Sequence, residues 1–403
     1  MAAYSVTLDG VSNFRSVDGN LIRWNGRLIE SLIEHDTASG ALNGTWKLEG
    51  RNWEIGYLSV ADSDGGRVKF IDADTRSGRH IDVLDLGVNS VVRLKTTAVD
   101  FVIGQSDADK HKVTLGSSDV TSVDLDAGIN VLKTRDGFVG SISTGGVDKV
   151  VVGAGGAGLI ATGNEDDTIK TQGGFVSAIS AGKGDDDVTI GSGGAESVAA
   201  GIGDDVINAK GGVSYINSGS GDDVVYLGAE GASVVQLQNG NDLVVLTELA
   251  RPEHGVILLG NDGTDTVSFA RYSVGVTVDL EETGWQDPAA TPVGLVQLRN
   301  FENVIGSDHA DNLTGNALDN KFTGNAGADV FTFTGTEKDP EAGFDRVLDY
   351  EEGIDLLRLP GQAFGDLVIQ DYGASLLITH ANGDILLKDM AGVTLDASDF
   401  LFV

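Results

Sequence analysis

The residues of this chain best suited to chemistry are aspartates that recur at one place in a short repeat. From Gly306 to Thr332 three nine-residue units follow without a break, GSDHADNLT, GNALDNKFT and GNAGADVFT, and a fourth, GNDGTDTVS, covers 260–268. Each unit begins with Gly, has Asp or Asn in sixth place and an apolar residue in eighth place. Glycine permits a tight turn with positive φ, the acid offers a hard oxygen ligand, and the apolar residue faces inward from a short strand. The pattern indicates a parallel β-roll that binds Ca²⁺ in its turns.

A second repeat of longer period lies upstream of these units. GNEDDTI, GKGDDDVTI, GIGDDVI, GSGDDVV and NGNDLVV each place an aspartate before a pair of mainly β-branched residues, and these aspartates are 18 or 19 residues apart. Asp148 stands 19 residues before the first of them, and Asn130 and His111 continue the register without the acid. Because 18 residues are two nonapeptides, we expect one acidic turn per coil, stacked along one edge from Asp148 to Asp242. Paired glycines such as Gly173-Gly174 are expected to turn the opposite edge.

The two repeats together supply the predicted calcium ligands. Stacked coils lie about 4.8 Å apart, and at that distance two carboxylates repel by about 0.9 kcal/mol even in water. The acidic edge is therefore expected to fray without cations and to close when Ca²⁺ binds. The predicted ligands are Asp148, Asp166, Asp167, Asp185, Asp186, Asp204, Asp205, Asp222, Asp223, Asp242, Asp262, Asp265, Asp308, Asp311, Asp319, Asn320 and Asp329. The residues predicted to face inward on the acidic half of the coils are Ile169, Val188, Ile207, Val225 and Val244.

From Gly260 to Val403 the chain resembles the RTX family, also called hemolysin-type calcium-binding repeat proteins. The segments DTVSFA, GVTVDL, FENVIGSDHADNLTGNALDN, GADVFTF and the ending LDASDFLFV carry the resemblance. It implies a β-roll with several Ca²⁺ ions between stacked turns. It also implies export by a type I secretion apparatus that reads an uncleaved C-terminal signal, which the last five residues resemble. It implies no particular activity, because such repeats accompany proteases, lipases, toxins, adhesins and surface-layer proteins.

Composition narrows the function classes further. The formal charge is −34, and residues 101–403 carry 47 acidic against 16 basic side chains. Such a surface attracts cations and argues against nucleic-acid or anionic-membrane partners. The absence of cysteine excludes disulfides, zinc–thiolate sites and cysteine nucleophiles. The start of the sequence does not have the pattern of a cleavable signal peptide, and no apolar stretch is long enough to predict a transmembrane helix.

The predicted fold is all-β: an elongated parallel β-roll or β-solenoid with calcium between stacked turns, a β-rich N-terminal region and a C-terminal β cap. We assign residues 1–85 to the N-terminal region or cap and 86–259 to the long-period solenoid, with 248–259 as a protruding loop. Residues 260–332 form the nonapeptide roll with an excursion at 281–303, and 333–403 the C-terminal region with the export signal. In the first region Trp24, Trp46 and Trp53 suit either a small β core or stacking on sugars.

Several motifs suggest other kinds of site, but each lacks a feature that such a site requires. Lys149–Ala161 (KVVVGAGGAGLIA) fits a dinucleotide fingerprint, but an acidic turn follows where a helix is required. Asp72 and Asp74 resemble the start of an EF-hand loop, but Arg76 occupies a ligand position and no helices flank it. The sequence contains neither His-Glu-x-x-His nor Gly-x-Ser-x-Gly. The residues Lys110, His111, Arg135, Lys149 and Tyr215 show no pattern along the sequence.

These observations favour a secreted, non-enzymatic, calcium-binding structural protein of the bacterial surface or extracellular matrix. Folding, and self-assembly into a layer or fibre, would follow Ca²⁺ binding outside the cell. One alternative is a calcium-dependent carbohydrate-binding or adhesion module with a surface polysaccharide as partner. Another is a polysaccharide epimerase or lyase on a parallel β-helix, which requires a cluster of basic or aromatic residues on one face.

Overall fold

The computed structural model describes side chains for residues 80–86, 90–104, 110–125, 128–250, 255–289, 294–334 and 345–403. It also describes the backbone of strands at 21–24, 27–30, 44–48, 53–60 and 68–72 and of Arg79. In these ranges the chain is all-β, and its only helical segments are the 3₁₀ turns Phe364–Asp366 and Ala397–Asp399. The described residues thus include no helix suited to crossing a membrane. The prediction of an all-β parallel β-solenoid is confirmed.

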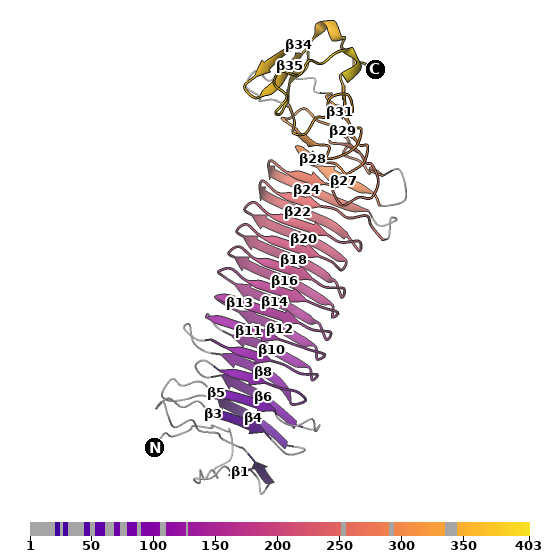
Figure 1. The fold of residues 1–403 in the computed structure, drawn as a ribbon. Helices are drawn as coiled ribbons and strands as arrows, with labels where there is room; N and C mark the ends of the chain where they lie inside the picture. The colour runs from indigo at the N-terminus through magenta and orange to yellow at the C-terminus, as the bar shows by residue number, and fades with distance from the viewer. Residues whose placement is uncertain are drawn as a thin grey trace. The chain divides into compact units, whose positions relative to one another are not determined.

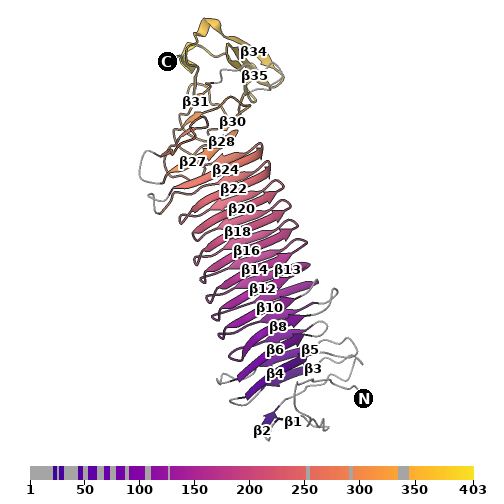
Figure 2. The same ribbon diagram turned by 180° about the vertical axis from the view of Figure 1, so that it is seen from behind.

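The chain divides into two compact units, Met1–Ile202 and Gly203–Val403. Unit 1 consists of two parallel sheets between which the chain alternates, so that one strand of each sheet makes one coil (Figures 1 and 2). Its even sheet contains β4 (Trp53–Val60), β6 (Arg79–Leu86), β8 (Ala98–Gly104), β10 (Val120–Leu125), β12 (Val139–Thr144), β14 (Ala157–Gly163), β16 (Val176–Lys183) and β18 (Ala195–Ile202). Its odd sheet contains β3 (Gly44–Leu48), β5 (Val68–Asp72), β7 (Val91–Arg93), β9 (Lys112–Thr114), β11 (Ile129–Lys133), β13 (Val147–Val152), β15 (Thr168–Thr171) and β17 (Asp187–Ile190).

The coils begin earlier than the sequence indicated. Strands β3 to β5 and most of β6 fall inside the predicted N-terminal region, yet they pair in parallel with the strands that follow them. A short antiparallel pair, β1 (Leu21–Trp24) and β2 (Arg27–Glu30), precedes them. The three tryptophan side chains and residues 73–78, on which the sugar-stacking and EF-hand interpretations rest, lie outside the described side chains.

Unit 2 continues the same construction and then changes period. One sheet contains β20 (Val213–Ser220), β22 (Ala232–Gly240), β24 (Val256–Gly263) and β27 (Val296–Arg299). The opposite sheet contains β19 (Val206–Ala209), β21 (Val224–Leu227), β23 (Leu243–Val245), β25 (Thr266–Ser268), β28 (Asn303–Ile305), β30 (Lys321–Thr323) and β32 (Asp345–Val347). A third sheet contains β26 (Thr277–Asp279), β29 (Asn312–Thr314), β31 (Val330–Thr332), β33 (Leu356–Arg358) and β37 (Phe400–Leu401).

In the nonapeptide region successive units alternate between these last two sheets, so two units make one coil, as predicted. The C-terminal β region is an antiparallel meander of β34 (Val368–Tyr372), β35 (Ser375–His380) and β36 (Gly383–Leu387). Strand β36 pairs in parallel with β32, and the terminal strand β37 pairs with β33. The last residues therefore continue a solenoid sheet; their reading as an export signal remains a prediction.

The space between the sheets is filled by the inward-facing apolar residues of the strands. The five residues predicted to face inward in the long-period coils, Ile169, Val188, Ile207, Val225 and Val244, are all 0% exposed. The eighth-place residues Leu313, Phe322 and Phe331 are also 0% exposed, and the two phenylalanine rings lie 6.0 Å apart. A narrow core of this kind depends on period-two alternation, which is why the strand positions could be read from the sequence.

Two predicted excursions are shorter than expected. The proposed loop 248–259 ends before residue 256, where β24 begins, and the excursion at 281–303 ends before residue 296, where β27 begins. Strand β24 thus crosses the predicted boundary at 259–260. In the dinucleotide-like segment, strand β13 leads through a glycine turn into strand β14, so the motif is a solenoid turn.

Candidate functional site

The predicted aspartates of unit 1 form a ladder inside one edge of the solenoid. Asp148, Asp167 and Asp186 are 3%, 2% and 2% exposed. The Oδ1 atom of Asp148 accepts a hydrogen bond from the backbone N–H of Asn130 at 2.9 Å. In the same way Asp167 accepts from the N–H of Asp148, and Asp186 from that of Asp167, each at 2.8 Å. Each carboxylate of this inner ladder therefore binds the backbone of the preceding coil.

Unit 2 contains an inner ladder of the same construction. The Oδ1 atoms of Asp223, Asp242 and Asp265 accept from the backbone N–H of Asp205, Asp223 and Asp242 at 2.8, 2.7 and 3.0 Å. The ladder then continues beyond the predicted residues, because the N–H of Asp265 donates to Oε2 of Glu302 at 2.7 Å. Glutamate replaces aspartate at the point where the excursion lengthens the coil.

In the nonapeptide region a second inner ladder runs along the other edge. Asp311 accepts from the N–H of Val276 at 2.7 Å, and Asp329 accepts from that of Asp311 at 2.8 Å. Asp355 continues it by accepting from the N–H of Asp329 at 2.9 Å. On the first edge Asn320 donates its N–H to Asp345 at 2.9 Å. Acidic turns thus line one edge in the long-period coils and both edges in the nonapeptide coils.

The aspartates that precede the buried ones form an outer ladder in the exposed turns. Oδ1 of Asp166 accepts from the N–H of Asp185 at 2.9 Å. Oδ1 of Asp204 accepts from the N–H of Asp222 at 2.8 Å, and Oδ1 of Asp222 from that of Asn241 at 2.7 Å. These carboxylates bind the following coil, whereas the inner ladder binds the preceding one. Asp262, Asp308 and Asp319 are exposed turn or strand residues beside the inner positions.

Burial makes the charged form of the inner carboxylates costly. Desolvation raises the pKa of Asp148, Asp223, Asp265 and Asp329 to about 6. It raises the pKa of Asp167, Asp186 and Asp242 to about 7, to which neighbouring carboxylates also contribute. The pKa values of Asp311, Asp355 and Glu302 are raised for the same principal reason. A bound cation would offset this cost, because an opposite charge nearby favours the ionised form.

The inner ladders also fit a hard cation by their donor atoms. In several of these aspartates one carboxylate oxygen accepts the inter-coil hydrogen bond, while the other, Oδ2, is buried and accepts none from a described residue. This holds for Asp148, Asp167, Asp223, Asp242 and Asp265. Buried polar atoms are rarely left without a partner, and carboxylate oxygens are the preferred ligands of Ca²⁺. The residues present therefore suit calcium, which the exposed aspartates and turn carbonyls would help to hold.

The first-place glycine of each nonapeptide has a different role from the one expected. Gly260, Gly306, Gly315 and Gly324 do not have positive φ; Asn261 and Asn325, in second place, do, at 74° and 68°. A Cβ atom at the four glycines would lie 2.1–2.3 Å from the side-chain oxygen of the sixth-place residue of the same unit. Glycine is required because the ligand side chain folds back into the space of its side chain.

Sequence reasoning missed Glu302, Asp345 and Asp355. Glu302 and Asp355 each precede a strand, as the predicted ligands do, and Asp345 begins one, but insertions place Asp345 and Asp355 25 and 26 residues after the ladder positions to which they bind. The motif Glu-Asn before the apolar pair of β28 was a usable signal for Glu302, and Asp-Leu-Leu at 355–357 was one for Asp355.

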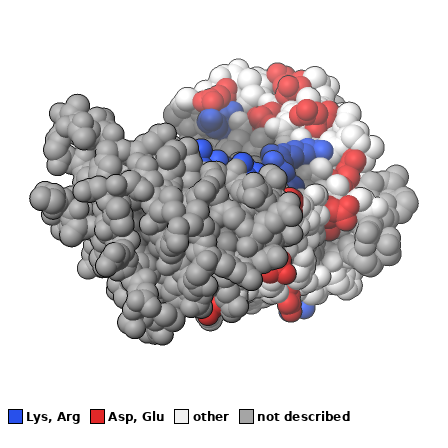
Figure 3. Space-filling model, turned by 90° about the horizontal axis from the view of Figure 1, so that it is seen from below, with Lys and Arg blue, Asp and Glu red and all other residues white. Residues whose placement is uncertain are grey.

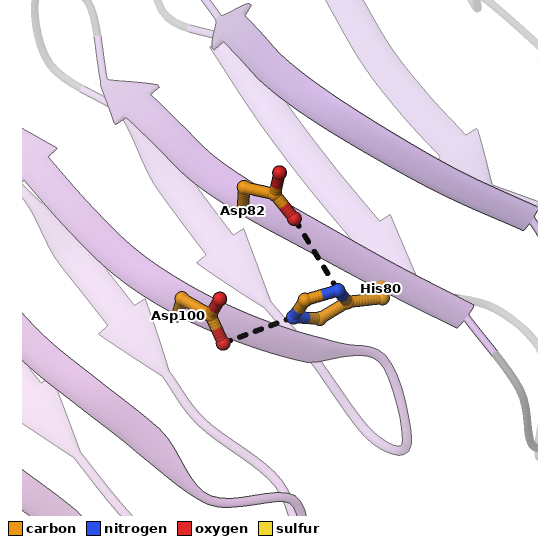
Figure 4. A group of neighbouring side chains, drawn as sticks. All are labelled: His80, Asp82 and Asp100. Atoms are coloured by element: carbon orange, nitrogen blue, oxygen red, sulfur yellow. Dashed lines mark hydrogen bonds and ion pairs between the residues drawn. The ribbon is translucent and has the colours of Figure 1, made fainter.

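A separate cluster lies on the outer face of the even sheet of unit 1 (Figure 4). His80 and Asp82 on β6 and Asp100 on β8 bring their ligand atoms within 4.8 Å of one another. Nδ1 of His80 lies 3.3 Å from Asp82, and Nε2 lies 2.9 Å from Asp100. Because the two nitrogens face different carboxylates, the imidazole ring bridges two acids across adjacent coils.

Parallel two-sheet coils whose turns are lined with inter-coil carboxylates define a calcium-binding β-roll class of protein. Residues 256–370 match the sequence model of the family described as peptidase M10 serralysin C terminal. This segment is therefore an RTX-type calcium-binding repeat domain, in agreement with the resemblance. The match is to the non-catalytic C-terminal domain of that peptidase family, and such domains belong to secreted proteins. No curated protein was found to match the chain.

Proposed function

We propose that the protein is a secreted, calcium-binding structural component of the bacterial surface or extracellular matrix. It folds when Ca²⁺ fills its acidic turns outside the cell and then assembles with other copies. The observation that carries the proposal is the inner ladder: buried aspartates in successive coils, each with one oxygen bound to the neighbouring backbone. Such an arrangement makes each coil dependent on the next.

The coupling between calcium and folding follows from charge and burial. Asp148 and Asp167 are adjacent rungs that are both nearly fully buried, so two negative charges at the spacing of strands disfavour the ionised, folded state. Calcium supplies the compensating charge when bound. Because the ligands come from consecutive coils, binding free energy becomes folding free energy. Nearest-neighbour contacts in a repeat array make the response cooperative.

The experiment that tests the proposal is sedimentation velocity of calcium-stripped full-length protein as Ca²⁺ is raised through the millimolar range. We expect compaction followed by larger species, and no comparable response to Mg²⁺, whose strict octahedral geometry suits these turns poorly. Compaction without larger species would contradict the proposed assembly but support calcium-dependent folding. An unchanged sedimentation coefficient would contradict both.

A further inference from the structure

The outward face of the odd sheet of unit 1 carries a regular array of basic residues. Strands β7, β9, β11, β13 and β15 each place one Lys or Arg outward, and these are Arg93, Lys112, Lys133, Lys149 and Lys170. The outward positions of the same five strands include no acidic residue. In a protein of net charge −34 this face, which we call the basic face, is an exception.

The pairing of the strands explains why the basic residues show no regular spacing in the sequence. Arg93, Lys133 and Lys170 fall in one column, joined through Thr114 and Val151, which pair between them. Lys112 and Lys149 fall in a neighbouring column, joined through Val131. The basic residues therefore alternate between two columns, and their sequence spacings of 19, 21, 16 and 21 conceal the period of 18 to 21. Lys149, which shows no pattern along the sequence, therefore belongs to a regular array once the strands are paired.

The other Lys and Arg residues between Arg93 and Lys170 are close in sequence to the strands of this face. Lys95 follows β7, Lys110 precedes β9 and Arg135 follows β11, each by two residues. The even-sheet strands β8, β10, β12 and β14 contain no Lys or Arg. In the view from below, Lys and Arg side chains gather into a band while most Asp and Glu side chains lie around it (Figure 3).

The charges of the basic face are largely available to a ligand. Arg93, Lys112, Lys133 and Lys149 are exposed, and none of them forms an ion pair with a described acidic residue. Lys170, at the end of the array, pairs with Asp187 of the next strand at 3.2 Å. Charges in one column lie two coils apart, about 10 Å, and the whole array spans about 20 Å from the spacing of strands. That length suits an extended polymer rather than a single small anion.

We propose that the basic face binds a linear anionic polysaccharide that carries carboxylate or sulfate groups. Lysine presents a compact, rotatable charge that adapts to such groups. Thr114 and Thr168 offer hydroxyl groups between the charges. Val131 and Val151, with short uncharged side chains, occupy the positions between the basic residues. The five strands contain no aromatic residue on which nucleic-acid bases could stack and no aromatic anchor of the kind that dominates protein interfaces. The inference does not rest on the proposed calcium-dependent folding.

The test is isothermal titration calorimetry of the calcium-loaded full chain with dextran sulfate, hyaluronate and uncharged dextran. We expect binding to at least one of the two charged polymers, weakening as NaCl is raised, and none to dextran. The variant Lys112→Gln/Lys133→Gln/Lys149→Gln should bind at least about tenfold more weakly. The matched control is Lys183→Gln/Lys210→Gln/Lys321→Gln, which removes three exposed lysines elsewhere and should change the affinity less than about threefold.

Equal affinities of the two triple variants, or no binding of either charged polymer by the wild type, would overturn the proposal. So would tighter binding of duplex DNA. Loss of self-association in the first variant, without polysaccharide binding by the wild type, would assign the face to a second copy instead. Acetylation footprinting gives an independent readout on the wild type, because dextran sulfate should protect Lys112, Lys133 and Lys149 but not Lys183 or Lys210. The calcium response of sedimentation should be the same in both variants, so failure here is distinguishable from failure of the proposed function.

Discussion

Asp222 and Asp223 are adjacent in the chain, but their carboxylates bind opposite neighbours. Asp223 accepts a hydrogen bond from the N–H of Asp205 in the preceding coil at 2.8 Å, and Asp222 accepts from that of Asn241 in the following coil at 2.7 Å. Asp223 is 1% exposed, whereas Asp222 lies in the open turn. An Asp-Asp pair therefore links its coil to both neighbouring coils. The repetition of such pairs explains why consecutive coils keep one register.

Replacing Asp223 separates its role as an acceptor from its role as a charge. Asp223→Asn keeps an oxygen for the N–H of Asp205 and removes a buried charge; Asn130 and Asn320 are native examples of an uncharged side chain at a buried ladder position. We expect calcium-free stability to be unchanged or higher and stabilisation by Ca²⁺ to be smaller. Asp223→Ala leaves a buried N–H without its partner and should cost about 1–3 kcal/mol in both conditions. Urea unfolding with chelator and with millimolar Ca²⁺ measures both effects.

The control is Asp222→Asn, which changes an exposed side chain and should alter calcium-free stability by less than about 1 kcal/mol. If Asp223→Asn destabilised the calcium-free protein as much as Asp223→Ala, the carboxylate charge itself would be required for the apo fold, contrary to the ladder described above.

Neighbouring glycines in one turn should tolerate alanine very differently. A Cβ on Gly174 would lie 2.1 Å from the backbone nitrogen of Gly156 in the adjacent coil, whereas a Cβ on Gly173 would meet nothing within 4 Å. Gly174→Ala should therefore destabilise unit 1 by about 1–3 kcal/mol, because the backbone must move apart. Gly173→Ala should stay within about 0.5 kcal/mol. Thermal unfolding of the two variants under the same calcium concentration compares them directly, and equal midpoints would refute the close stacking of these turns.

The sequence predicted the repeating parts of this structure because one physical constraint acts on every coil. Inward residues such as Ile169 and Val188 alternate with outward ones, and Asp167 and Asp186 precede them at a constant spacing. The coil period, the acidic edge and the burial of the eighth-place residues all follow from that regularity.

The features that could not be predicted from the sequence are those that depend on how coils of unequal length align with each other. Asp355 and Glu302 bind ladder positions across insertions, so their distance along the chain gives no indication of their partners. The basic face was missed for a related reason. Lys133 and Lys149 occupy different columns, and only the strand pairing shows that each coil contributes one charge.

His80 should contribute to stability because its ring lies between two carboxylates. The pairing of β6 with β8 places Asp82 opposite Asp100, and the imidazole ring lies between them. His80→Gln removes the ring that bridges the two carboxylates and leaves like charges facing each other in adjacent coils, which should cost about 0.2–1 kcal/mol. The double variant His80→Gln/Asp100→Asn should recover most of this loss, as measured by urea unfolding at pH 6. Equal stability of the single variant and the wild type would mean that solvent already screens the pair.

The calcium-free protein should be more stable in mild acid than at neutral pH. Burial raises the pKa of Asp167 and of Asp242 from 3.8 to about 7, so between about pH 4 and pH 7 the folded chain holds protons that the unfolded chain has released. Stability then falls as pH rises through this window and levels off above it. Calcium requires the ionised form, so its stabilising effect should grow over the same window.

Thermal unfolding of calcium-stripped protein from pH 5 to pH 8, with and without added Ca²⁺, tests this prediction. The two curves should lie closest near pH 5 and diverge toward pH 8. Asp167→Asn/Asp242→Asn removes two of the titrating groups, so its calcium-free curve should be flatter than that of the wild type. A calcium-free midpoint that rises from pH 5 to pH 8 would show that the inner carboxylates are already ionised in the folded chain. The ladders would then be held by their backbone hydrogen bonds despite the full charge repulsion.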